Sequence, residues 1–199
     1  YPYINSPVQI TRIEVWVTNR GYQTQNVRNI VALQDLGEAD PESTSLANQV
    51  SNFINVTDEN HPPGNEVNRL DPDEIGIDGI LTNEIRDIAT VKNGFGTTRV
   101  NEGYDYAILE SARKLNAQEY SFHPQLGYIS LSQRLSNDEI LGIAYQYSFQ
   151  GKIYQVGEFA NGDVPGTSLI QTGNGTQQNT QNPVIQTNNL VVKMLKSSV

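Results

Sequence analysis

Residues 139–159 limit the possible folds of this chain more than any other part of the sequence. In residues 139–149 the apolar side chains recur at every second position, as they do along a strand with one continuous apolar face. Gln150-Gly151 then supplies a two-residue turn, with glycine where a positive φ is needed, and residues 152–159 return along it. The pattern predicts an antiparallel hairpin in a mainly β fold.

Residues 8–18 form a second strongly patterned strand. The apolar positions change parity near Thr11, which predicts a β-bulge at that residue. Beyond the bulge the strand alternates as a half-buried strand does, with Glu14 and Trp16 on the face opposite the apolar one. The two patterned segments together define the predicted core, which consists of Ile13, Val15, Val17, Leu141, Ile143, Tyr145 and Tyr147.

Helical signals are confined to the middle of the chain. Asp40-Pro41-Glu42 has the features of a helix start, and the apolar spacing that follows predicts a helix over about 41–55. A second, shorter helix is predicted over about 80–90. Between them lies an acidic, turn-rich stretch, residues 57–78, which we expect to cross the surface. We therefore predict an antiparallel β-sandwich-like domain over 1–160 with a helical insertion within 40–100.

The C-terminal part of the chain has a different composition. Residues 161–189 are rich in Gly, Asn, Gln and Thr, and Asp163 is the only ionisable residue among them. This composition predicts a polar linker or an extended excursion. Residues 190–199 contain a short apolar run that cannot fold alone, so we expect a terminal strand that pairs with another strand.

Composition excludes several classes of function. The chain has no cysteine, which excludes disulfides, thiolate catalysis and cysteine-ligated zinc. Its formal net charge of −9 makes nucleic-acid binding a poor interpretation, because an acidic surface repels phosphates. No apolar run is long enough to span a bilayer as a helix, so we expect no direct membrane span in these residues.

The sequence contains no recognisable catalytic constellation. Its two histidines, His61 and His123, each lie beside a proline, and we interpret both as surface turn residues. Paired carboxylates could in principle hydrolyse glycosides, but the acidic residues gather in the 57–78 loop, where no apolar pocket is available to raise a pKa. We therefore predict that the chain is not an enzyme and has no catalytic residue and no cofactor.

The acidic loop also raises the question of calcium. Asp71 and Asp73 fit the first ligand positions of an EF-hand loop, and Asp78 lies nearby. Ile75 occupies a ligand position, however, and Thr82 stands where the bidentate glutamate belongs. A solvated acidic loop explains the pattern better, and we predict no metal site.

The 10 tyrosines suggest an alternative function, a surface carbohydrate-binding β-sandwich with an aromatic platform. Most of them fall in predicted strands, where cross-strand packing explains them better. A pocket with stacked, exposed aromatic rings would favour the carbohydrate alternative.

Five blocks of sequence, in the same order, resemble the SprA/Sov family. They are ITRIEVWVTNR (10–20), NVRNIVALQDLGE (26–38), YDYAILESARKLNAQEYSFHPQLGYISLSQRL (104–135), YQVGEF (154–159) and LVVKMLKSS (190–198). That family comprises the outer-membrane translocon of the type IX secretion system of Bacteroidota, which is also a gliding-motility protein. The resemblance implies that this chain is a soluble segment of a much larger outer-membrane barrel.

The resemblance also implies a role and partners. The expected role is that of a non-catalytic scaffold, cap or partner-docking module in protein transport across the outer membrane, on its extracellular or periplasmic face. The expected partners are the rest of the parent barrel, other secretion-system subunits and secreted cargo proteins destined for the cell surface. Arg28 and Arg113 lie inside the family-like blocks, and we expect each to pair with a carboxylate within the fold.

Overall fold

The structure, a computed structural model, describes residues 8–34, 36, 81–97, 100–170 and 184–198. Strands make up 47% of these residues and helical turns 5%, so the predicted mainly β class is confirmed. The elements are β1 (Gln9–Val17), β2 (Val27–Leu33), η3 (Asn83–Arg86), η4 (Val91–Asn93), β3 (Tyr106–Lys114), β4 (Tyr120–His123), β5 (Tyr128–Leu131), β6 (Leu141–Phe149), β7 (Lys152–Val156), β8 (Thr167–Ile170), β9 (Val184–Thr187) and β10 (Leu190–Lys196).

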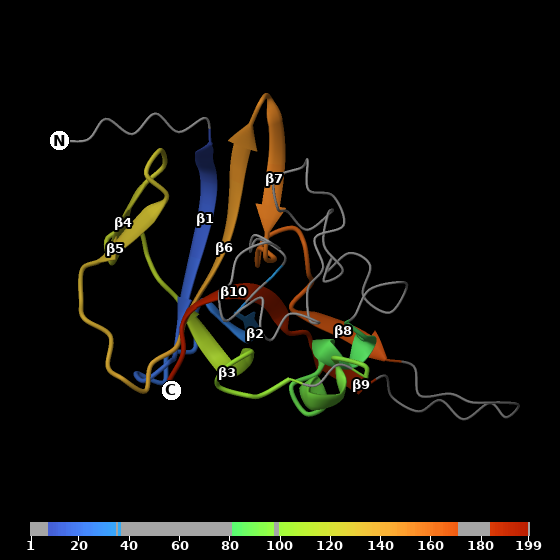
Figure 1. The fold of residues 1–199 in the computed structure, drawn as a ribbon. Coiled ribbons are helices and arrows are strands. Elements are labelled where there is room, and N and C mark those ends of the chain that lie inside the picture. Colours follow the sequence, from blue (N-terminus) through green and yellow to red (C-terminus); the bar gives the residue numbers. More distant parts are fainter. Residues whose placement is uncertain (1–7, 35, 37–80, 98–99, 171–183, 199) are drawn as a thin grey trace, which may run out of the picture.

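Five strands form a sheet that closes on itself (Figure 1). The strand order is β1-β3-β2-β10-β6, and β6 pairs back onto β1, while β7 continues outward from β6. Within this ring β10 runs parallel to β2, and the other pairs are antiparallel. An odd number of strands cannot alternate in direction all the way around a closed ring, so one parallel pair is unavoidable. The sheet is therefore mainly antiparallel, as the sequence predicted, with one parallel pair that the sequence pattern did not indicate.

The two strongest sequence patterns are found in the sheet as predicted. The β6–β7 hairpin turns at Gln150-Gly151, where both residues have positive φ, 49° and 80°. The register of β1 against β6 shifts between Ile10 and Arg12, which confirms a bulge at Thr11.

The interior of the ring holds one apolar cluster to which all five strands contribute. Four of its ten strand positions are alanines, which leaves space inside the ring for larger side chains such as Trp16 and Phe159. At Gly142 an added Cβ would lie 2.8 Å from Val192 Cγ2, so that position has no room for a side chain. The members are Trp16, Ile30, Ala32, Ala107, Leu109, Ala112, Ala144, Phe159, Val164, Leu190, Val192 and Met194.

Strand β1 is buried on both faces rather than on one. Val15 and Val17 belong to an outer cluster, whereas Trp16 lies in the ring interior, and Glu14 is also buried. The prediction of a half-buried strand was therefore wrong for Glu14–Val17, because closure of the sheet covers the second face. Of the predicted core, five side chains are buried (Val15, Val17, Leu141, Ile143 and Tyr147), and Ile13 and Tyr145 are partly buried.

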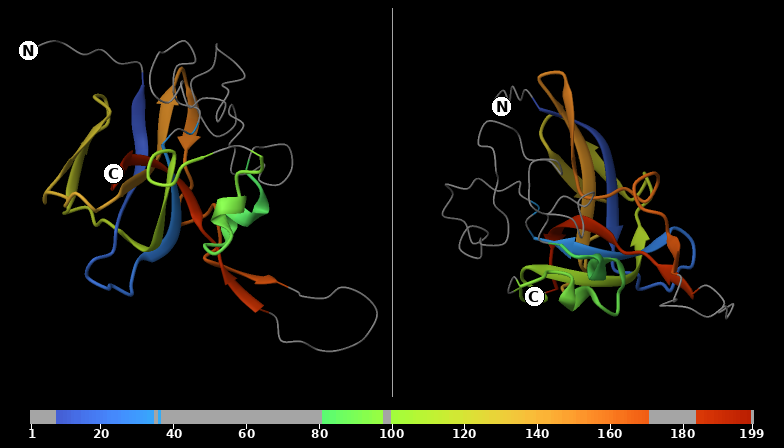
Figure 2. Two further views of the ribbon diagram at one scale, coloured as in Figure 1. Left: turned by 60° about the horizontal axis from the view of Figure 1, so that its bottom comes forward. Right: turned by 90° about the vertical axis from the view of Figure 1, so that its right-hand side faces the viewer.

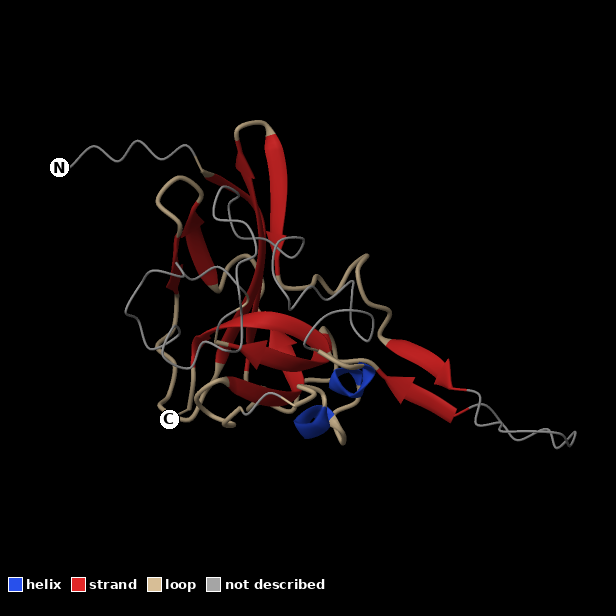
Figure 3. Cartoon of the chain, turned by 45° about the vertical axis from the view of Figure 1, so that its right-hand side comes forward, coloured by secondary structure: helices blue, strands red, loops and turns tan. Residues whose placement is uncertain are grey.

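Two separate layers cover the outer faces of the ring (Figure 3). The segment with η3 and η4 places Leu81, Ile85, Val91 and Phe95 over β2, β3 and β10. The β4–β5 hairpin covers β1 and the start of β6. Instead of one helix over 80–90, the chain forms two short 3-10 turns that fold back on each other, with the amide of Thr82 bonded to the carbonyl of Gly94 at 2.9 Å. The helix predicted over 41–55 lies outside the described residues.

The described parts of the polar segment 161–189, residues 161–170 and 184–189, contain more regular structure than their composition predicts. Val164 is buried in the ring cluster, and β8 and β9 pair as an antiparallel ribbon that projects from the sheet (Figure 2). The terminal run forms β10, whose pairing with both β2 and β6 completes the ring. The division into domains remains a prediction.

Candidate functional site

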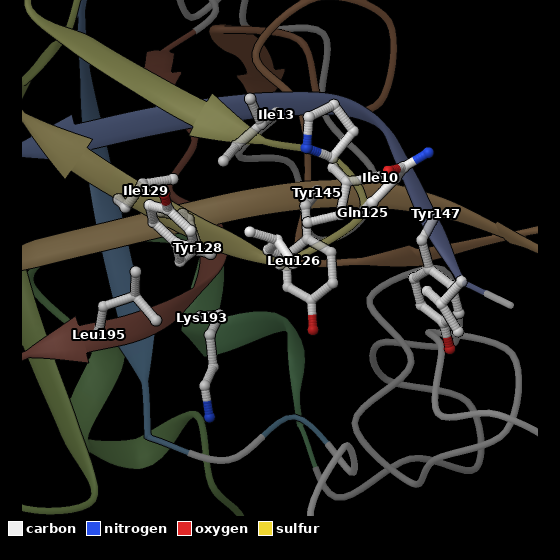
Figure 4. Close-up of a pocket in the computed structure, with 14 residues that line it drawn as sticks. Ile10, Ile13, Gln125, Leu126, Tyr128, Ile129, Tyr145, Tyr147, Lys193 and Leu195 are labelled. Atoms are coloured by element: carbon white, nitrogen blue, oxygen red, sulfur yellow. The ribbon is translucent and has the colours of Figure 1, made fainter. Parts of the chain in front are cut away.

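An apolar groove of about 740 Å³ lies on the outer surface of the closed sheet, between the β4–β5 hairpin and β10 (Figure 4). Its floor comes from β1 and β6, one wall from residues 124–129, and the other wall from β10. Its lining is mostly aliphatic and aromatic. A concave apolar surface of this kind is a candidate site for a ligand or partner.

The floor of the groove exists because of the bulge at Thr11. Ile10 pairs with Tyr147 and Ile13 with Tyr145, although the two isoleucines are three positions apart. Without the extra residue, an odd spacing would point them to opposite faces of the sheet. The bulge therefore brings both isoleucines onto the face that carries the tyrosines, and all four line the groove.

The first wall is a tight turn between β4 and β5. The amide of Gly127, whose φ is 65°, donates to the carbonyl of His123 at 2.9 Å. The amide of Ile10 donates to the carbonyl of Pro124 at 3.0 Å, which fixes this turn against β1. Leu126 and Tyr128 rise from the turn and remain 45% and 47% exposed.

The second wall is the end of β10. The register of β10 against β6 shifts between Met194 and Lys196, and Leu195, at this irregularity, is 46% exposed. Lys193 also lines the groove, and its Nζ donates to the carbonyl of Gln34. Three large apolar side chains that the fold leaves exposed, Leu126, Tyr128 and Leu195, therefore lie around one groove.

The lining of the groove is mostly apolar. Among the described residues that form it there is no carboxylate and no histidine, and Lys193 is the one charged side chain. Burial, and secondly the neighbouring Tyr154, raise the pKa of Tyr147 to about 12, so this phenol stays protonated near neutral pH. A protonated phenol is a poor general base, and the described lining offers no acid–base pair.

Of the histidines and aspartates considered as candidate site residues in the sequence, only His123 belongs to the part of the chain that the structure describes. His61, Asp71, Asp73 and Asp78 lie outside the described residues. His123 is exposed at the end of β4, where its ring stacks on Tyr128 with centroids 4.5 Å apart.

The two arginines of the family-like blocks have different partners. Arg113 pairs with Glu119 at 2.6 Å, as predicted. Arg28 instead donates to main-chain carbonyls, among them those of Val164 at 3.2 Å and Asn188 at 3.4 Å. Burial lowers the pKa of Arg28, while the charges of Glu158 and Glu14 act in the opposite direction. The prediction of a carboxylate partner for Arg28 was therefore wrong, because the loop after β7 places carbonyls around its guanidinium.

Sequence reasoning missed a buried ion pair between Arg86 and Glu158. The guanidinium meets the carboxylate through two bonds of 2.6 Å, and Glu158 is only 2% exposed. The carboxylate also accepts the amide of Val191 at 2.7 Å, while Asn189 donates to the carbonyl of Ile85 at 2.9 Å. Burial raises the pKa of Glu158, and Arg86 acts against that shift. The network joins η3, the end of the β7 segment and β10.

A second buried carboxylate, Glu14, is also used within the fold. It accepts a bond from Lys114 Nζ at 2.6 Å and another from the amide of Ala160 at 3.0 Å. Neither Glu14 nor Glu158 lines the groove. Both act as internal ties between segments that are distant in sequence.

Two further properties concern metals and membranes. Among residues 8–34, 36, 81–97, 100–170 and 184–198, no group of three or more acidic or histidine side chains is placed to hold a metal ion. In the same part of the chain, no helix has the length and apolarity needed to cross a membrane.

Comparison with known proteins gives one informative result. No curated protein matches the chain. A family model, SprA_N, described as motility related/secretion protein, matches residues 1–141 and therefore well over half of the sequence. The chain belongs to this motility-related and secretion protein family, as its resemblance to SprA predicted.

Proposed function

We propose that this chain is a non-catalytic, partner-docking segment of the outer-membrane translocon of type IX secretion in Bacteroidota. Membership of the motility and secretion family supports the general role. The apolar groove is the observation that carries the docking role. Its expected occupant is an apolar segment of another polypeptide, either cargo or a subunit of the secretion system.

The lining of the groove favours a polypeptide. Protein interfaces draw most of their binding energy from a few aromatic and aliphatic anchors in desolvated pockets. Leu126, Tyr128 and Leu195 are such side chains, and the described lining of the groove between them contains no carboxylate, although the whole chain carries a formal charge of −9. An apolar segment can enter without leaving a buried charge unpaired.

One observation favours the alternative, a carbohydrate ligand. The His123–Tyr128 stack places an exposed aromatic ring at the rim of the groove, as a sugar-binding platform would. Sugars also need convergent hydrogen-bonding groups, and the side chains of the lining provide few beyond Gln125, Lys193 and the tyrosine hydroxyls. The polypeptide is therefore the better fit.

The test is a secretion assay on cells whose parent gene carries substitutions in the groove, with protein abundance measured in parallel. Leu126→Asp places a charge in the apolar groove and should reduce export about tenfold or more, the effect of losing one anchor of an interface. Tyr104→Asp is the matched control, because Tyr104 is 65% exposed and does not line the groove. Normal export with Leu126→Asp would refute the docking role.

Further substitutions separate the two kinds of ligand and test for chemistry. Tyr128→Leu keeps an apolar side chain, so a polypeptide should still bind, whereas a sugar would lose its aromatic platform. The single substitutions His61→Ala, His123→Ala and Asp73→Ala should leave export intact, because an interface does not depend on one ionisable group. Lost export at normal abundance in any of these three would indicate a catalytic or metal site.

A further inference from the structure

The β8–β9 ribbon is a separate two-stranded sheet that projects from the closed ring (Figures 2 and 3). Its strands pair from Thr167 opposite Thr187 to Ile170 opposite Val184. Neither strand pairs with any other described strand. Isolated two-stranded sheets are only marginally stable in water, so a projecting ribbon of this kind needs support.

The base of the ribbon is firmly attached to the body. Asn188 donates from its amide to the carbonyl of Gly166 and from its side chain to the carbonyl of Pro165, both at 3.0 Å. The hydroxyl of Ser168 donates to the side-chain oxygen of Asn188 at 3.1 Å. Arg28 donates to the main-chain carbonyl of Asn188 at 3.4 Å. These contacts fix the direction of the ribbon where it leaves the body.

The register shows which main-chain groups point outward. Gly166 and Asn188 form a hydrogen-bonded pair, and such pairs alternate with non-bonded ones along an antiparallel ladder. Ser168–Gln186 is therefore the next bonded pair, and Leu169–Ile185 is a non-bonded one. The amide and carbonyl groups of Ile185 and Thr187 consequently point away from β8, along the free edge of β9.

Apart from its short length of four residues, this edge lacks the features that usually protect edge strands. Proteins protect exposed edges with charged side chains, proline or bulges. Residues 164–192 contain no ionisable side chain, and neither strand contains proline. Ile185 is 67% exposed in the middle of β9.

We propose that β9 receives an extended strand from a partner polypeptide, which hydrogen-bonds to the outward main-chain groups of Ile185 and Thr187. The partner segment must itself be a strand, because only another strand presents a row of main-chain donors and acceptors that matches the outward groups of β9. The uncharged ribbon matches an uncharged strand. A second copy of this chain is a poorer partner, because two bodies that each carry a formal charge of −9 repel each other.

Three substitutions test the main-chain contact directly. Ile185→Pro removes an outward amide while leaving the bonds between β8 and β9 in place, as proline is tolerated on a free edge. Ile185→Ala removes the side chain but keeps the amide. Gln186→Pro removes an amide that points toward β8. It therefore breaks a hydrogen bond within the ribbon and shows how a disrupted ribbon behaves in the same measurements. Thermal unfolding of the isolated chain should show Ile185→Pro as wild type, which confirms that its ribbon is intact.

The readout is amide hydrogen exchange at single-residue resolution, in the isolated chain and in the assembly purified from the outer membrane. The amides of Ile185 and Thr187 should exchange about tenfold more slowly or more in the assembly, as expected for a newly hydrogen-bonded group. In the Ile185→Pro assembly the protection of Thr187 should be lost, and in the Ile185→Ala assembly it should persist. The result does not depend on the groove, so it can fail while the proposed function stands.

Three outcomes would overturn the proposal. Equal exchange in the isolated chain and the assembly would show that no strand is added. Loss of protection with Ile185→Ala as large as with Ile185→Pro would show that the side chain, not the main chain, makes the contact. Protection that appears in the isolated chain on raising its concentration, together with dimers in sedimentation velocity, would show that the partner is a second copy.

Discussion

The buried Arg86–Glu158 pair leads to the most quantitative prediction. Arg86→Met keeps much of the aliphatic stem and removes the guanidinium, which leaves Glu158 with one partner from the network, the amide of Val191 at 2.7 Å. Removing one member of a buried ion pair costs about 3–5 kcal/mol, because the remaining charge is buried and uncompensated. With Glu158 only 2% exposed, we expect the free energy of unfolding to fall by roughly that amount near neutral pH.

The loss should depend on pH in a defined direction. Burial raises the pKa of Glu158 in the folded chain, so the folded state binds its proton more tightly than the unfolded state does. The contribution of this group to stability is therefore fully present below the ordinary pKa of a glutamate and is lost as pH rises through the folded value. Removing Arg86 removes an effect that lowers the pKa, and protonation of Glu158 then relieves the buried charge. The destabilisation by Arg86→Met should shrink as the pH is lowered.

Urea unfolding followed by the fluorescence of the single tryptophan, buried Trp16, measures this free energy at a series of pH values. Arg20→Met is the matched control. Arg20 pairs with Asp138 on the exposed surface, so this variant should lose little free energy of unfolding. Equal losses in the two variants would refute the argument from burial. A loss in Arg86→Met that grows toward acidic pH would refute the assignment of the effect to the Glu158 charge.

Two further predictions concern packing and charge. Gly142→Ala should lower the free energy of unfolding by about 1–3 kcal/mol in the same assay, because the new Cβ would lie 2.8 Å from Val192 Cγ2. Gly21→Ala is the control and should be neutral, because its new Cβ would lie 3.9 Å from Gln23 Cγ, at ordinary van der Waals distance. A hydrogen bond from the amide of Asn116 is the main cause of the lowered pKa of Glu119. The contribution of Glu119 to stability is therefore present above the ordinary glutamate pKa and is lost as pH falls through the lowered value. Glu119→Gln should abolish that part of the pH dependence of unfolding.

Local features of this fold were predictable from the sequence because they depend on neighbouring residues. The bulge at Thr11 follows from a change of parity within one strand. The hairpin at Gln150-Gly151 follows from alternation on both sides of a two-residue turn. The family resemblance follows from contiguous blocks of sequence, and the match over 1–141 confirms it.

Features that depend on distant residues were not predictable in the same way. Nothing in the local sequence of Glu158 distinguishes it from a surface glutamate, and its partner Arg86 is 72 positions away. The short apolar run of β10 could be assigned to a strand, but not to the place between β2 and β6. Closure of the sheet depends on that placement, and so does the burial of the second face of β1.

The helix predicted over 80–90 shows how tertiary contacts override local periodicity. Leu81 and Ile85 have helical spacing, and both are indeed buried. The backbone becomes extended at Asp87, however, and the chain returns so that Gly94 packs against Ile85, where an added Cβ would lie 2.7 Å from the Ile85 amide nitrogen. Two short turns thus place Leu81 and Ile85 on the sheet without a continuous helix.

The position of the groove follows from how the outer face of the ring is covered. Strands β1 and β6 carry apolar side chains on both faces, so closing the sheet buries one face and leaves the other to be covered by a second layer. The β4–β5 hairpin covers Val15, Val17 and Leu141, and beyond it the same face continues into the groove floor. There β6 carries Tyr145 rather than another aliphatic residue, and a tyrosine tolerates both water and a protein partner. Among the described residues, the cover of this apolar face ends with the hairpin and the groove continues the face beyond it, so a docked polypeptide would extend that layer.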